Sequence, residues 1–162
     1  MLTLNTMKTS FFWLAMAGLL ASLLTGCSPA QSASQTGSSA GAEITWLTDY
    51  DAALKLAQFT NKLVVVDFYA TWCGYCKLMD RNTFTDANVQ QRLAGFVPLK
   101  IDADKQPQLA AKYGVEGLPM MLVIDANGKP LAGAAGYLEP DRYLAVLDQA
   151  KTSSTGTNDV VK

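Results

Sequence analysis

Blocks of apolar residues along the chain predict four strands. Residues 63–69 form a near-continuous apolar run, which is typical of a central strand covered on both faces. Asp67 is the one charged residue within that run. Shorter apolar runs over 96–102, 120–124 and 131–135 predict three further strands. An Asn-Gly pair lies between the last two runs and is typical of a hairpin turn, so we expect these two strands to form a hairpin.

Between the strands, apolar residues recur at helical spacing. The predicted helices cover residues 50–57, a segment from the cysteine pair towards Arg81, residues 85–93, residues 108–113, and a last helix that begins at Pro140. Thr48 and Asp51 form a weak capping box before the first helix, and Thr85 is placed to cap the third. The expected order βαβαβαββα indicates an α/β domain over residues 43–150 with a mixed sheet between helices. The polar segment 151–162 is expected to be a disordered tail.

The first residues have the pattern of an export signal. Lys8 is the only charge in residues 1–26, and the apolar run that follows it, 11–24, is shorter than the roughly 20 residues of a membrane span. The run ends in Leu-Thr-Gly-Cys, which resembles the lipobox of bacterial lipoproteins. That resemblance implies removal of residues 1–26 and attachment of lipid to Cys27. Ordinary signal cleavage or an uncleaved anchor, with Cys27 incidental, are the alternatives.

Residues 28–42 contain no large apolar side chain and cannot form a core, so segment 27–42 is predicted to be a lipidated cysteine followed by a flexible tether. Such a tether reaches about 20 Å on average and about 50 Å when stretched. Ser28 follows the cysteine directly, and the lipoprotein sorting rule would send such a protein to the outer membrane of a Gram-negative host. We therefore expect a domain anchored in the bacterial envelope and facing the periplasm, where disulfides persist.

The composition of the chain excludes several kinds of binding and catalytic site. The chain has 162 residues, 49% of them apolar, and a net charge of −1, so there is no basic field for nucleic acid. It contains no histidine, which excludes Cys/His zinc sites, His-ligated haem and His-based acid–base catalysis. Three cysteines occur, and two of them, Cys73 and Cys76, are separated by only two residues.

Cys73 and Cys76 lie where a buried strand passes into a helix, and this position has a chemical consequence. A helix N-terminus favours an anion, so we expect the pKa of the Cys73 thiol to fall and Cys73 to be the nucleophile. Cys76 lies within one turn and can close a reducible disulfide with it. A zinc site would need two more ligands, and a purely structural disulfide would restrain the unfolded chain very little. We therefore predict a redox-active disulfide without metal or other cofactor.

Two segments carry a family resemblance. Residues 66–77, Val-Asp-Phe-Tyr-Ala-Thr-Trp-Cys-Gly-Tyr-Cys-Lys, resemble the active-site segment of the thioredoxin superfamily, and residues 113–119, Tyr-Gly-Val-Glu-Gly-Leu-Pro, resemble its cis-proline segment. The resemblance covers about residues 42–150 and implies a thioredoxin fold, a central mixed β-sheet flanked by helices. Residues 76–90 are most similar to the C-terminal domain of DsbD-type thiol:disulfide interchange proteins. Here that domain would stand alone on a lipid.

The resemblance assigns roles to two charged residues. Asp67 matches the buried acid that helps to remove the proton from the resolving cysteine, and a carboxyl group on an apolar strand should have a raised pKa. Lys100 stands where the family has a lysine that pairs with this acid. The alternatives are an Asp67 that only pairs with a lysine in the core, and a Lys100 that is a solvated residue at a strand end.

The resemblance also indicates a substrate groove. Pro119 matches the cis-proline, and the backbone of Leu118 would hold an extended substrate segment as an added strand. Other positions would flank Cys73 or line the groove: Trp72, Gly74, Tyr75 and, less securely aligned, Gly136. Ordinary packing is the alternative for Trp72. Met120 departs from the threonine that usually follows the proline, and Gly74-Tyr75 departs from the Gly-Pro of thioredoxins.

These features together predict a membrane-tethered thiol–disulfide oxidoreductase that mainly reduces disulfides of envelope proteins or relays electrons. It would be a monomer and would receive electrons from a DsbD-type membrane reductant. An envelope disulfide oxidase or isomerase is the alternative within the same chemistry. A non-catalytic adaptor or chaperone that uses only the groove is the alternative outside it, and a copper metallochaperone has no Met-rich or His-rich segment in its favour.

Overall fold

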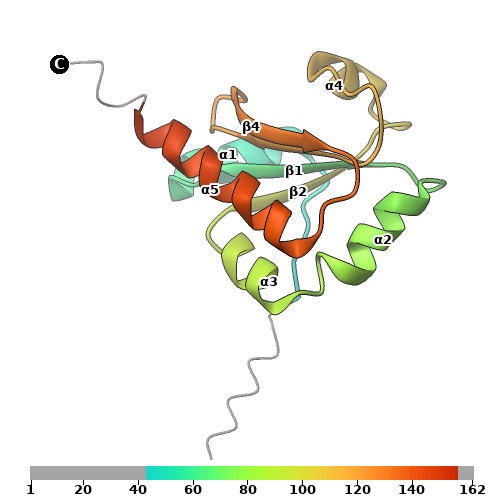
Figure 1. Cartoon of the computed structure of the whole chain (residues 1–162). Coiled ribbons are helices and arrows are strands. Elements are labelled where there is room, and N and C mark those ends of the chain that lie inside the picture. The colour runs from blue at the N-terminus through green and yellow to red at the C-terminus, as the bar shows by residue number, and fades with distance from the viewer. Residues whose placement is uncertain (1–42, 157–162) are drawn as a thin grey trace, which may run out of the picture. The chain divides into compact units, whose positions relative to one another are not determined.

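A computed structural model describes residues 43–156 of the chain (Figure 1). The predicted signal peptide, Cys27, the tether and residues 157–162 lie outside the described residues. None of the helices within 43–156 is long and apolar enough to cross a membrane.

The four predicted strands form one mixed sheet. Its strands are β1 (Val64–Tyr69), β2 (Val97–Asp102), β3 (Met120–Ile124) and β4 (Pro130–Ala135), in the spatial order β2-β1-β3-β4. β1 pairs with β2 in parallel and with β3 antiparallel, and β3 and β4 form the predicted hairpin. Every strand lies within one residue of its predicted bounds, because each is a strongly apolar run between turn residues.

Five helices cover the two faces of the sheet. They are α1 (Tyr50–Thr60), α2 (Gly74–Asn82), α3 (Ala87–Leu93), α4 (Pro107–Lys112) and α5 (Pro140–Gly156). α1 and α4 pack on the face of Val64, Val66 and Phe68, while α2, α3 and α5 pack on the face of Val65. Figure 1 shows α5 crossing in front of the strands and α1 behind them. The predicted mixed sheet between helices is confirmed.

The predicted order is wrong at its first strand, the one expected before the helix at residues 50–57. The expected first strand is a single bridge, in which Leu47 pairs with Leu99, because the polar residues that follow it start α1 at once. Two helices, α2 and α3, connect β1 to β2, as predicted for the segment from the cysteine pair towards Arg81 and for residues 85–93. Both expected caps are also wrong by one residue. Asp49 rather than Thr48 caps α1, and Asp86 rather than Thr85 caps α3, because a carboxylate accepts the free N–H groups and Thr85 instead donates to the carbonyl of Arg81.

The last helix is longer than predicted. Residues 151–156 continue α5, so the disordered tail expected from residue 151 is contradicted as far as Gly156. Ala150 is fully buried, and the Nζ of Lys151 lies 5.0 Å from the centre of the Phe96 ring. The hydroxyl groups of Thr152 and Thr155 donate to carbonyls one turn earlier in the helix. These contacts stabilise the polar last turns of α5, whereas the sequence pattern alone predicts that the helix ends before them.

Candidate active site

The cysteine pair lies where β1 leads into α2. Cys73 is the N-cap of α2, with extended backbone angles, and its Sγ accepts a hydrogen bond from the Cys76 N–H at 3.1 Å. The two sulfur atoms form a disulfide with an S–S distance of 2.09 Å, as the spacing predicts. Cys73 and Cys76 are only 4% and 3% exposed. When the bond is reduced, the same N–H and the helix dipole stabilise a Cys73 thiolate, which makes Cys73 suited to nucleophilic attack.

A cis-proline loop packs against this disulfide. The Leu118–Pro119 peptide bond is cis, which confirms the expectation from the resemblance. Leu118 packs against the buried cluster formed by Ala70, Cys73 and Cys76. Gly136 donates its N–H to the Pro119 carbonyl at 2.8 Å, from a left-handed conformation with φ 84°. The end of β4 thus holds the loop in place, and Gly136 reaches the loop through its backbone.

Two aromatic side chains beside the cysteines are exposed. Trp72 is 69% exposed and Tyr75 is 66% exposed, so Trp72 is not an ordinary packing residue. The Trp72 Nε1–H donates to Oδ2 of Asp104 at 2.9 Å. Asp104 is held in turn, because its own N–H donates to a carboxylate oxygen of Asp102. A methyl group at Gly74 would meet no atom within 4 Å, so sterics do not require glycine there.

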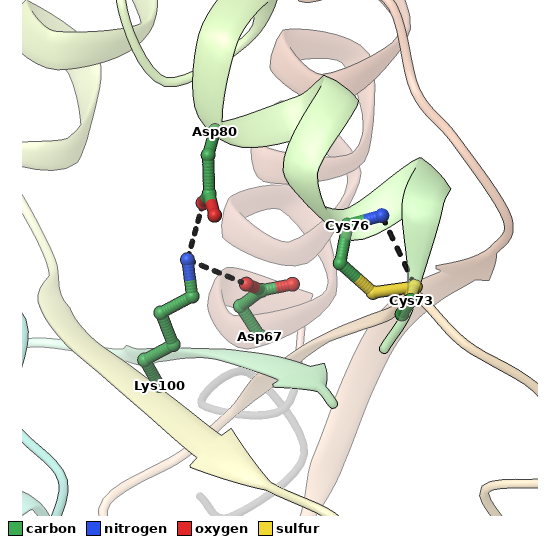
Figure 2. A network of polar contacts seen from close by, with 5 residues as sticks. All are labelled: Asp67, Cys73, Cys76, Asp80 and Lys100. Carbon is green, nitrogen blue, oxygen red and sulfur yellow. Dashed lines mark hydrogen bonds and ion pairs between the residues drawn. A yellow bond between two sulfur atoms is a disulfide. The ribbon is translucent and has the colours of Figure 1, made fainter. Parts of the chain in front are cut away.

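Asp67 lies under the disulfide and is 2% exposed. Figure 2 shows its carboxyl group between Lys100 and the cysteine pair, with one oxygen directed towards each. The Lys100 Nζ lies 3.6 Å from Oδ2 of Asp67. Burial raises the pKa of Asp67 from 3.8 to about 7, a rise that the Lys100 charge opposes and the Asp80 charge assists. A carboxyl group with such a pKa can take up and release a proton near neutral pH.

Lys100 is enclosed rather than solvated. Its side chain is 15% exposed, and its Nζ donates to Oδ1 of Asp80 on α2 while it faces Asp67 on β1 (Figure 2). Three aromatic rings surround the same Nζ at 5.1–5.5 Å from their centres, those of Trp46, Tyr69 and Phe84. Lys100 therefore joins β1, β2 and α2 around the catalytic candidate Asp67, and the alternative of a solvated lysine is excluded.

Sequence reasoning missed Asp80 and Asp104. Asp80 lies four residues after Cys76 on α2, a spacing that places both on one helix face and that could have pointed to it. Asp104 follows β2, and β1 and β2 are parallel, so the residues after both strands meet at one sheet edge. That rule could have placed Asp104 near Trp72, although it does not predict the hydrogen bond.

The site is a surface rim rather than a deep cavity. Hollows of about 510, 450 and 430 Å³ lie elsewhere on the domain and are lined by none of the predicted site residues. Within residues 43–156 there is no group of three or more Cys, Asp or Glu side chains that could hold a metal ion. A shallow rim of exposed aromatic rings around a sulfur pair is suited to a protein segment rather than to a small molecule enclosed in a pocket.

Comparisons with known proteins agree with this geometry. A family model described as a thioredoxin-like domain matches residues 50–151. The thiol:disulfide interchange protein DsbD of Haemophilus ducreyi is 37% identical over 113 residues, which cover 66% of this chain and 19% of that protein. DsbD of Vibrio cholerae is 36% identical over 145 residues, which cover 83% of this chain and 24% of that protein. The chain thus spans about a fifth of the length of such relatives.

Solved structures give the same fold. A thioredoxin from Thermus thermophilus is similar with a TM-score of 0.64 and 25% identity, over 72% of this chain and 94% of that one. A DsbH oxidoreductase is similar with a TM-score of 0.60 over 78% of this chain and 95% of that one, and at 22% identity this likeness concerns the fold alone. The expected thioredoxin fold is confirmed.

Proposed function

This chain belongs to the thioredoxin-like domain family, and on that basis we propose that it is a membrane-tethered reductase of protein disulfides in the bacterial envelope. Thiol–disulfide exchange itself follows from the family and from the Cys73–Cys76 disulfide. The observation that carries the proposal is the position of that disulfide, at a helix N-terminus, against the cis-proline loop and above a buried carboxyl group.

The first step of the proposed reaction is attack by the Cys73 thiolate on a substrate disulfide. A mixed disulfide forms between Cys73 and one substrate sulfur, and the other substrate sulfur leaves as a thiolate and takes up a proton from water. The hydrogen bond from the Cys76 N–H to the Cys73 Sγ stabilises the attacking thiolate. Trp72 and Tyr75 give the substrate an apolar contact surface, and the backbone of Leu118 pairs with its chain.

The second step is resolution by Cys76. Asp67, in its ionised form, accepts the Cys76 proton, and the Cys76 thiolate attacks Sγ of Cys73. The second substrate sulfur leaves as a thiolate, and the Cys73–Cys76 disulfide forms again. Two electrons have then passed to the substrate, so the protein needs a dithiol partner to be reduced. The similarity to DsbD favours a DsbD-type membrane protein as that partner.

The tether and the envelope location rest on the sequence. The charged start, the short apolar run and the Leu-Thr-Gly-Cys segment favour a lipid on Cys27, and a redox disulfide is suited to the compartment that such an anchor faces. Envelope proteins with exposed disulfides are the proposed substrates.

The reduction potential of the Cys73–Cys76 pair tests the direction of the reaction. The full chain is equilibrated with a dithiothreitol or glutathione series, and its free thiols are trapped with a maleimide. A potential near that of thioredoxin, about −270 mV, supports the reductase, and a Cys76→Ala variant should then accumulate mixed disulfides with its substrates. A potential near about −120 mV would instead make the chain an oxidant or isomerase.

A further inference from the structure

Two buried polar atoms within residues 43–156 have no hydrogen-bond partner in the protein. One is Oδ1 of Asp67, the carboxylate oxygen that does not face Lys100. The other is the hydroxyl oxygen of Tyr143, a residue of α5 with no exposed surface. An unpaired buried hydroxyl destabilises the folded protein, whereas phenylalanine would fill the same space without that cost. The hydroxyl of Tyr143 therefore needs an explanation.

Asp67 and Tyr143 face the same side of the sheet. Asp67 follows Val65 by two residues on β1 and is opposite Met121 on β3, and Tyr143 packs in one core cluster with both of these apolar residues. The Phe84 ring connects the two sites, because its centre lies 5.5 Å from that of Tyr143 and 5.3 Å from the Lys100 Nζ. In Figure 2 the helix α5 passes behind Asp67.

Electrostatics agrees with this geometry. The pKa of Tyr143 is raised well above its ordinary value, first by burial and then by the negative charge of Asp67. The field of the Asp67 carboxylate thus reaches the Tyr143 hydroxyl. Neither atom forms a hydrogen bond, so the two are not bonded to each other directly, and an internal water commonly joins buried polar groups in this situation.

We propose that Tyr143 is a positioning residue for Asp67 and that one internal water molecule joins its hydroxyl to Oδ1 of Asp67. The hydroxyl donates to the water, and the water donates to the carboxylate. Such a donor chain stabilises the ionised form of Asp67, which is the form that accepts the Cys76 proton, and it holds Oδ1 in its direction towards Cys76. The inference rests on the proposed role of Asp67 in the resolving step.

The other groups around Asp67 also affect its protonation equilibrium, and the test leaves them unchanged. Lys100 on β2 favours the ionised carboxylate, Asp80 on α2 disfavours it, and β3 presents the apolar Met121. Cys76 on α2 is the proton donor. Tyr143 is the residue that α5 adds to the surroundings of Asp67. Removal of its hydroxyl alone leaves the remaining groups in place.

The test compares the full chain with Tyr143→Phe, in which only the hydroxyl is lost. The Asp67 carboxyl carbon is titrated by NMR on aspartate-labelled protein in the oxidised state. We expect the titration midpoint in Tyr143→Phe to rise by at least about half a pH unit, a threefold increase in proton affinity. Tyr137→Phe is the matched control, because the Tyr137 hydroxyl contacts Asn82 near the surface, and its midpoint should equal that of the unmodified chain.

A second measurement on the unmodified chain keeps the test independent of the variant's folding. A long-lived internal water gives a nuclear Overhauser effect from water to the ring protons of Tyr143. Absence of this effect, or an Asp67 midpoint that is unchanged or lower in a folded Tyr143→Phe, overturns the inference. Neither readout uses turnover. If the unmodified chain fails to reduce insulin disulfides, the proposed function fails while the water site is still decided by NMR.

Discussion

At the scale of the residue, the charge of Asp67 is set by groups from several elements. Sequence alone singled out Asp67, because a lone carboxyl group in an apolar strand is conspicuous, and the family resemblance pointed to Lys100. The structure joins the two and adds Asp80, which the sequence did not reveal. The aromatic rings around Lys100 come from three separate segments, and no local pattern brings Trp46, Tyr69 and Phe84 together.

Replacement of Asp67 by asparagine should stabilise the protein at alkaline pH. The folded pKa of Asp67, about 7, lies above its ordinary 3.8, so the carboxyl group contributes most to stability at low pH and that contribution is lost as pH rises from 4 to 7. Asp67→Asn should therefore gain up to about 4 kcal/mol at pH 8, less the cost of the lost Lys100–Asp67 ion pair, and most of the gain should vanish at pH 4.5. Urea unfolding at both pH values measures this, and an equal effect at the two would contradict it. Asp67→Asn should also slow the resolving step, because asparagine cannot accept the Cys76 proton.

Replacement of Lys100 by methionine should shift the pH dependence of disulfide reduction to higher pH. Methionine keeps most of the length of the side chain and removes the positive charge 3.6 Å from Asp67, so the pKa of Asp67 should rise above about 7. The acid limb of the rate of insulin-disulfide reduction should shift to higher pH. Lys105→Met is the matched control, because Lys105 is largely exposed and pairs with Asp102 rather than Asp67. Identical profiles for the two variants would remove Lys100 from the mechanism.

At the scale of the element, sequence predicted the strands better than the helix ends. The strands are apolar runs with few competing interpretations, whereas each missed cap has two candidate residues side by side, and the choice of Asp49 over Thr48 depends on one hydrogen bond. The last turn of α5 depends on its contact with Phe96, far away in the sequence. The Asn-Gly turn was predictable because the conformation at Gly128, with φ 82°, strongly favours glycine.

Two glycines with similar backbone angles should respond differently to alanine. Gly128 and Gly136 have φ of 82° and 84°, so alanine should cost about 1–2 kcal/mol in backbone strain at either position. At Gly128 the added methyl would also lie 2.5 Å from the Tyr50 hydroxyl, which is hydrogen-bonded to Tyr113, whereas at Gly136 it meets nothing within 4 Å. Gly128→Ala should therefore be the more destabilising by at least about 1 kcal/mol in urea unfolding. Equal losses of stability at the two positions would show that the Tyr50 and Tyr113 side chains move aside at no cost.

At the scale of the whole molecule, the described residues form the exchange domain, and the predicted anchor lies outside them. The fold class and the central site were predictable because one continuous segment, from Asp67 to Cys76, carries most of the chemistry. The prediction of location rests instead on a short N-terminal pattern and on one cysteine. Anchor and chemistry are therefore separable, and each can be changed without the other.

Replacement of Cys27 by serine should release the protein from the membrane without changing its redox chemistry. A lipid on Cys27 is the only predicted membrane anchor once residues 1–26 are removed. Cys27→Ser should therefore move from the detergent phase to the aqueous phase in Triton X-114 partition. Its reduction potential should equal that of the unmodified chain, because Cys27 takes no part in the Cys73–Cys76 disulfide. Cys73→Ser, the matched control, should stay in the detergent phase and lose exchange. Retention of Cys27→Ser in the detergent phase would instead indicate an uncleaved apolar anchor. An unmodified chain found in the aqueous phase would indicate ordinary signal cleavage.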